Sequence, residues 1–188
     1  MGLDMYLTRK KYIGGNYEHN KVKGIIDLEK NGTKIPIDLS KISYIDEEVL
    51  YWRKANAIHK WFVDNIQEGT DDCKDYYVSS KDLKELLEIC NEVIEKAILI
   101  DGQIQVSESF KDGKWVANYE NGKVIKNVEE ISKILPTESG FFFGGTEYDE
   151  YYLEDIKYTI EKLTKILEEE KELNENKISY HYEYTSSW

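Results

Sequence analysis

Apolar residues recur at spacings of three and four in two long stretches of this chain, and this periodicity predicts two amphipathic helices. One begins after the Ser79-Ser80 pair, a favourable helix N-cap, and the other covers about residues 148–173. An apolar stripe on such a helix must pack against another layer of structure. The predicted buried positions are Leu83, Leu86, Leu87, Cys90, Val93, Ile94 and Ala97 in the first helix, and Tyr152, Ile156, Thr159, Ile160, Leu163, Ile166 and Leu167 in the second.

Strand-like segments lie outside these helices. Residues 3–13 and 178–185 are rich in aromatic and β-branched side chains, which favours strands at the two ends of the chain that belong to one sheet. A third helix is predicted over residues 53–67, with Ala55, Ile58, Phe62 and Ile66 on its apolar face. This grouping indicates an α+β fold, in which an antiparallel or mixed sheet is covered by two or three helices.

Turn dipeptides predict additional hairpins. Residues 22–28 and 33–39 flank Asn31-Gly32, and Pro36 requires the second arm to be an edge strand or to break there. Asp112-Gly113 and Asn121-Gly122 predict a small β-meander, which we interpret as an insertion at residues 98–127 within a single domain of residues 1–188. A short helix at 127–134 and a buried strand at 141–143 complete the predicted elements.

Composition limits the classes of function. The chain has 188 residues, with 25 Lys and Arg against 37 Asp and Glu, a formal net charge of −12. This charge argues against direct nucleic-acid binding and against an anionic membrane as partner. The first residues lack a basic stretch before an apolar segment, which predicts a cytoplasmic protein. Two cysteines are too few for a disulfide framework or a four-thiolate site, so we expect no metal and no cofactor.

The segment YWRKANAIHKWF at residues 51–62 is the first candidate for a functional site. On the predicted helix, His59 joins the apolar face, Asn56 and Trp52 border it, and Arg53 and Lys60 lie beside Asn56. The two cations and the first-turn amides would suit a phosphate or carboxylate, and Trp52 could stack an aromatic ring. The structural alternative is that His59 hydrogen-bonds a backbone carbonyl and that the cations only solvate a surface.

The second candidate is the segment LPTESGFFFGGT at residues 135–146. Thr137, Ser139 and Gly140 would place hydroxyls and backbone amides where a ligand could approach closely. There is no Gly-Lys-Ser/Thr tail and no GxGxxG, which argues against a nucleoside triphosphatase or a dinucleotide enzyme. The alternative is a plain turn before a buried strand.

Four sequence blocks together resemble an uncharacterised family of small proteins encoded by phages and prophages. The blocks are GLDMYL at residues 2–7, YWRKANAIHKW at 51–61, LPT and SGFFFG within 135–144, and the terminal SSW. The resemblance implies a host-cell cytosolic setting and an accessory protein that counters host defence by binding a signalling nucleotide or a host protein.

These observations leave three functional hypotheses. The first is a pocket that binds a small anionic ligand, with nucleotides among the candidates, and sequesters it. The second is an acidic protein–protein inhibitor or nucleic-acid mimic that binds a host protein, and the 15 tyrosines also suit a homo-oligomer interface. The third is an enzyme that uses His59 as general acid or base. The predicted ligand-binding residues are Trp52, Arg53, Asn56, His59, Lys60, Thr137, Ser139 and Gly140, which we expect to meet around one cleft.

Overall fold

A computed structural model describes residues 2–14, 24–111, 113–140 and 143–188. In this part of the chain the main sheet is antiparallel and has four strands in the order β4-β1-β8-β5. The N-terminal strand therefore lies inside the sheet, between β4 and the C-terminal strand β8, as the strand-like ends of the chain predicted. The strands are β1 (Asp4–Tyr12), β4 (Tyr44–Arg53), β5 (Tyr76–Val78) and β8 (Tyr180–Ser187).

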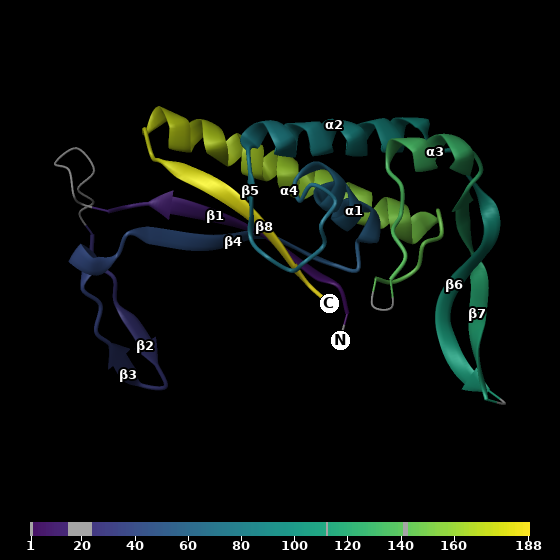
Figure 1. Ribbon diagram of the computed structural model, residues 1–188, viewed down its shortest axis with the longest axis horizontal. Helices are drawn as coiled ribbons and strands as arrows, with labels where there is room; N and C mark the ends of the chain where they lie inside the picture. The colour runs from purple at the N-terminus through teal and green to yellow at the C-terminus, as the bar shows by residue number, and fades with distance from the viewer. Residues whose placement is uncertain (1, 15–23, 112, 141–142) are drawn as a thin grey trace.

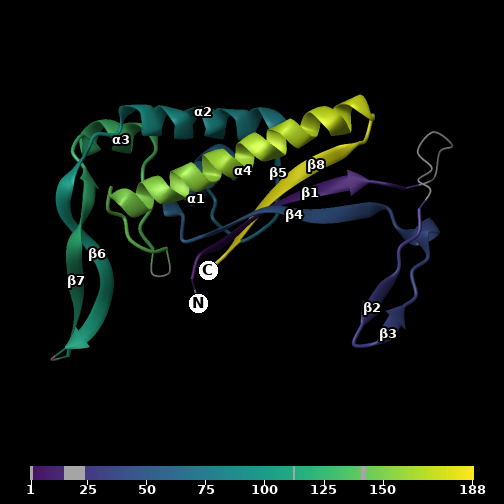
Figure 2. The ribbon, with the colours of Figure 1, turned by 180° about the vertical axis from the view of Figure 1, so that it is seen from behind.

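Helices cover one face of this sheet (Figure 1), and the α+β prediction is confirmed. Met5 and Leu7 of β1 have no exposed surface, whereas their neighbours Tyr6 and Thr8 face the other side and are partly exposed. Seen from behind in Figure 2, α4 runs diagonally across the sheet with α2 beside it. No helix in the described residues is long and apolar enough to cross a membrane. The helices are α1 (Asn56–Asn65), α2 (Ser80–Lys96), α3 (Val128–Ile134) and α4 (Glu150–Glu175).

Both long helices form where their apolar stripes predicted them. Ser79 caps α2 by accepting the N–H of Asp82, and the Asp82 carboxylate accepts the Ser79 N–H in return. The short helix predicted at 127–134 corresponds to α3.

The helix predicted over 53–67 begins three residues later than expected. Trp52 and Arg53 belong to β4, where Trp52 pairs with Met5 and Arg53 with Asp4. Burial alternates at the end of this strand, since Leu50 and Trp52 are buried while Tyr51 is only partly covered. The period of two extends through Trp52, so the helical spacing begins only at Asn56.

The Asn31-Gly32 hairpin forms, with short arms β2 (Leu28–Lys30) and β3 (Thr33–Ile35). Both turn residues have positive φ, 53° and 76°, as a two-residue hairpin turn requires. The second arm ends immediately before Pro36, as predicted. Residues 22–23 of the predicted first arm lie outside the described residues.

The β-meander predicted from two turns is wrong, because the chain forms one long two-stranded ribbon of β6 (Leu99–Lys111) and β7 (Lys114–Ile125). Asn121-Gly122 makes no turn; Gly122 pairs with Gly102 inside the ladder. A Cβ on Gly122 would lie 2.5 Å from Ile104, so this glycine permits close packing rather than a reversal. The ribbon projects from one end of the molecule and the β2–β3 hairpin from the other (Figure 1).

The buried strand predicted at 141–143 does not appear in the described residues. Phe143 is buried, with 8% of its surface exposed, but it lies in a bend. Phe141 and Phe142 lie outside the described residues.

A buried arginine joins three elements at the far end of the sheet. Arg9 of β1 is 6% exposed, and its guanidinium lies 2.9 Å from Glu47 of β4 and 2.9 Å from Glu169 of α4. Lys11 also contacts Glu47, at 2.7 Å. Burial opposes ionisation of Glu47, but hydrogen bonds from Lys11 and Arg9 outweigh it and hold the pKa of Glu47 below its ordinary value.

We expect Arg9→Ala to lower the free energy of unfolding by about 2 kcal/mol, because it removes the buried side chain that joins Glu47 to Glu169 and leaves Glu169 without this partner. Lys11→Ala is the matched control, since Lys11 is more exposed and Glu47 keeps Arg9; its cost should not exceed about 1 kcal/mol. Urea unfolding measures both, and equal losses would contradict the role given to Arg9.

Candidate functional site

A tight turn connects β4 to α1. Lys54 adopts a left-handed backbone with φ of 59°, and its N–H donates to the Leu3 carbonyl at 2.8 Å. Ala55 follows with φ −74° and ψ 68°, an inverse γ-turn in which Asn56 N–H donates to Lys54 O at 2.8 Å. The helix therefore starts abruptly at Asn56, with no side-chain N-cap.

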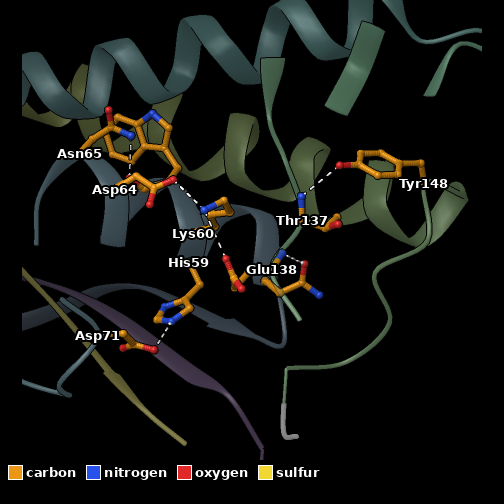
Figure 3. Close-up of polar contacts among 10 residues, drawn as sticks. His59, Lys60, Asp64, Asn65, Asp71, Thr137, Glu138 and Tyr148 are labelled. Atoms are coloured by element: carbon orange, nitrogen blue, oxygen red, sulfur yellow. Dashed lines mark hydrogen bonds and ion pairs between the residues drawn. The ribbon is translucent and has the colours of Figure 1, made fainter. Parts of the chain in front are cut away.

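Asn56 fastens this turn to the second candidate segment. Its amide Nδ2 donates to the carbonyls of Phe143, at 3.1 Å, and Gly145, at 2.6 Å. Its Oδ1 accepts the N–H of Glu138 at 3.3 Å. Lys60, one helical turn farther along α1, lies 3.3 Å from the Glu138 carboxylate (Figure 3). The two segments singled out in the sequence are thus in direct contact.

A cavity of about 700 Å³ lies beside this contact. It is bounded by residues 53–58, by residues 105–107 of β6, by Thr137 with residues 144–147, and by the start of α4 as far as Ile156. The wall from β6 coincides with the shift in pairing register between Gln105 and Ser107. The volume falls within the range of about 300–1,000 Å³ that is usual for small-molecule sites.

One wall of the cavity is cationic. Arg53 and Lys54 are exposed there, and neither has an acidic partner within the described residues. The backbone N–H groups of Ala57 and Ile58 in the first turn of α1 also find no acceptor in that part of the chain. Free first-turn amides beside two cations favour an anionic group.

Three acidic residues, Glu147, Asp149 and Asp155, also line the cavity, and we call the part formed by Asp149 and Asp155 its acidic wall. Asp149 is 5% exposed and caps α4 by accepting the N–H groups of Tyr151 and Tyr152, at 2.9 and 3.2 Å. Burial raises the pKa of Asp149 despite these hydrogen bonds. Burial also raises the pKa of Asp155 to about 7, with a further contribution from the negative charges of Glu154 and Asp149. Asp155 can therefore gain or lose a proton near neutral pH.

The structure distributes the predicted ligand-binding residues unevenly. Arg53, Asn56 and Thr137 line the cavity. Ser139 and Gly140 are exposed but lie outside its lining. Trp52 is 2% exposed and donates its indole N–H to Thr159 at 2.9 Å, so it has no free face on which a ligand could stack, and that prediction is corrected.

Lys60 and His59 also lie outside the cavity lining. Lys60 is held by Asp64, at 2.9 Å, as well as by Glu138 (Figure 3). His59 has no exposed surface; Nδ1 lies 2.7 Å from the Tyr184 hydroxyl and Nε2 lies 3.0 Å from Asp71. A substrate cannot reach this imidazole, because both ring nitrogens are occupied inside the core.

Burial raises the pKa of Tyr184 well above its ordinary value, so the hydroxyl keeps its proton and can donate it to Nδ1 of His59. Nε2–H is then free to donate to the Asp71 carboxylate. Through these hydrogen bonds, His59 connects α1 to β8 and to the loop that follows α1. The alternative structural interpretation of His59 is therefore correct in kind, although its partners are side chains instead of a backbone carbonyl.

The sequence did not single out several residues of the cavity. In the sequence, Asp149 and Asp155 stand at helical spacing, which suits acid–base chemistry and the acidic first turns of a helix equally well, and Lys54 has no assigned role. No spacing pattern could have found them, because the cavity closes only when β6 and α4 meet the β4–α1 turn. No model of a protein family, no curated protein and no solved structure matches this chain.

We expect Asn56→Asp to lower the free energy of unfolding, measured by urea denaturation, by about 3 kcal/mol. A carboxylate cannot donate to the two carbonyls that the amide satisfies, and it adds a buried charge. Asn91→Asp is the matched control, since the exposed Asn91 makes one contact within α2. A loss for Asn56→Asp no larger than that for Asn91→Asp would show that the hydrogen bonds from Asn56 do not hold the two segments together.

Asp155 should make the protein less stable as pH rises. The folded carboxyl keeps its proton up to a pKa of about 7, whereas the unfolded one loses it near its ordinary value. Asp155→Asn should match the wild type near pH 4 and exceed its free energy of unfolding by about 2–4 kcal/mol above pH 7. Urea titrations across this pH range measure the difference in free energy of unfolding between variant and wild type. Glu168→Gln, an exposed change on the same helix, should give a difference that does not vary with pH. A flat difference for Asp155→Asn as well would show that its carboxyl is not perturbed.

Proposed function

We propose that this protein binds a small anionic ligand, with nucleotides as the leading candidates, in the cavity between α1, α4 and the β6–β7 ribbon, and that it acts by sequestering that ligand. The observation that carries the proposal is the cationic wall. Arg53 and Lys54 lie at the cavity without an acidic partner in the described residues, although the chain has twelve more acidic than basic residues.

Elementary electrostatics supports the same assignment. A phosphate or carboxylate at this wall would receive charge-assisted hydrogen bonds from two side chains and from free amides at the start of α1. Lys54 reaches this position from a left-handed backbone that costs a non-glycine residue about 1 kcal/mol. Strain of this kind is often retained where a side chain has a functional position.

The resemblance to phage-encoded proteins supplies the proposed setting, the host-cell cytosol, where removal of a signalling nucleotide would counter a defence response. The alternative of an acidic inhibitor or nucleic-acid mimic has weaker support. Along the exposed side of α4, Lys157 and Lys165 alternate with Glu154, Glu161 and Glu168, so the helix presents mixed charge.

A second candidate function is acid–base catalysis on the bound ligand. His59 cannot serve, because it is fully buried, but Asp155 lines the cavity and has a pKa raised to about 7. A carboxyl with such a pKa can exchange a proton with a ligand at neutral pH. Chromatography of the ligand after incubation with the protein separates turnover from simple binding.

Thermal unfolding against a panel of nucleoside monophosphates and ribose 5-phosphate tests the proposal. A ligand at 100 times its dissociation constant should add about 2.7 kcal/mol, which is a shift of a few degrees. Lys54→Gly should leave the unliganded protein equally or more stable, since glycine tolerates the positive φ, yet should weaken binding about tenfold or more. Arg53→Gln should weaken binding similarly.

Lys60→Gln is the control variant, because Lys60 is held by Asp64 and Glu138 outside the cavity lining. Its ligand-induced shift should equal that of the wild type. The proposal fails if the panel produces no shift, or if the Lys54 and Arg53 variants respond to ligand as the wild type does.

A further inference from the structure

The cavity lining carries both cationic and acidic side chains, so the acidic residues set a second chemical requirement for the ligand. Glu147, Asp149 and Asp155 line the same cavity as Arg53 and Lys54, and no Lys or Arg contacts any of the three carboxylates in the described ranges. Those ranges also contain no group of three or more His, Cys, Asp and Glu side chains that could hold a metal ion. A ligand that carries only negative charge would be attracted by Arg53 and Lys54 and repelled by the carboxylates.

The two acids of the acidic wall are not equivalent. One oxygen of Asp149 already accepts two backbone N–H groups as the cap of α4. The Asp155 carboxylate accepts no hydrogen bond from the described residues, and its main-chain carbonyl takes the Thr159 hydroxyl at 2.7 Å. Asp155 is therefore the free acceptor on this wall.

An ionised carboxylate can only accept hydrogen bonds, so the group that faces it must present donors. Among the common nucleobases, guanine alone offers two adjacent donors, N1–H and the exocyclic N2 amine, on one edge. Adenine and cytosine pair a donor with an acceptor, and uracil flanks one donor with two acceptors. Tyr151, 47% exposed at the same wall, offers a ring face against which a base could stack.

We propose that the ligand is a guanine nucleotide whose phosphate lies at Arg53 and Lys54 and whose N1–H and N2 amine donate to Asp155. This inference rests on the proposed function, since it assumes that the cavity binds a nucleotide. It adds the class of base and the residue that selects it.

Calorimetric titration of the full chain at pH 8.5 with the 5′-monophosphates of guanosine, inosine, xanthosine and adenosine tests the inference. Guanosine monophosphate should bind most tightly; inosine monophosphate lacks the exocyclic amine and should bind about tenfold more weakly. Xanthosine monophosphate carries a carbonyl in place of that amine, which would face the carboxylate with an acceptor, so it should bind more weakly still.

Asp155→Asn supplies the sharpest result. An amide presents one donor and one acceptor, which matches the xanthine edge, so the order of guanosine and xanthosine monophosphates should invert. Glu154→Gln is the matched control, because Glu154 is exposed, adjacent in sequence and outside the cavity lining; it should preserve the wild-type order. Circular dichroism confirms that each variant is folded, and the wild-type ranking tests the inference even without the variant.

Two kinds of failure remain distinguishable. If neither ribose 5-phosphate nor any nucleotide binds, the proposed function fails and the inference fails with it. If the four nucleotides bind equally, or if Asp155→Asn keeps the wild-type order, the cavity binds phosphates and the guanine assignment is overturned.

Discussion

The hydrogen bonding of β1 between β4 and β8 is the constraint on which the rest of the fold depends. The first strand lies inside the sheet, so the sheet cannot form until the last strand has returned beside it. Leu3, Met5 and Leu7 have no exposed surface, and they provide the apolar floor on which the helices pack. Because long-range pairs of this kind close large loops, both chain ends contribute to one cooperative core.

The same strand pairing positions the candidate site. The Leu3 carbonyl accepts the Lys54 N–H, which fixes the turn at the end of β4 and thus the start of α1. The Ile125 N–H of the ribbon donates to the Tyr148 carbonyl, next to Asp149, which caps α4. Elements distant in sequence are thereby held around one cavity by backbone contacts, which is a rigid arrangement for charged side chains.

The sequence predicted what short-range physics determines. Periodicity located α2 and α4, the Ser79 cap marked the start of α2, and Asn31-Gly32 set the first hairpin. The sequence prediction assigned Trp52 and Arg53 to the helix instead of β4, because a buried strand end and a helix start carry similar residues. It interpreted Asn121-Gly122 as a turn because the pairing of Gly102 with Gly122 is a tertiary feature. The two candidate segments are in contact through Asn56, but five of the eight residues expected around one cleft lie outside the cavity lining. The acidic wall requires α4 and β6 to come together and has no local signature.

Arg53 and Lys54 are distinguished from other cations by their position in the lining of a cavity that also carries acidic side chains. Arg9, Lys10, Lys60 and Lys74 have acidic partners, whereas Lys81, Lys84 and Lys157 have no ion pair in the described residues. Arg53 and Lys54 have none in the described residues, although Asp149 and Asp155 line the same cavity. Two sets of opposite charge that face one space without pairing leave both unsatisfied. A ligand with an anionic group at one end and hydrogen-bond donors at the other would pair with the cations and with the carboxylates at the same time.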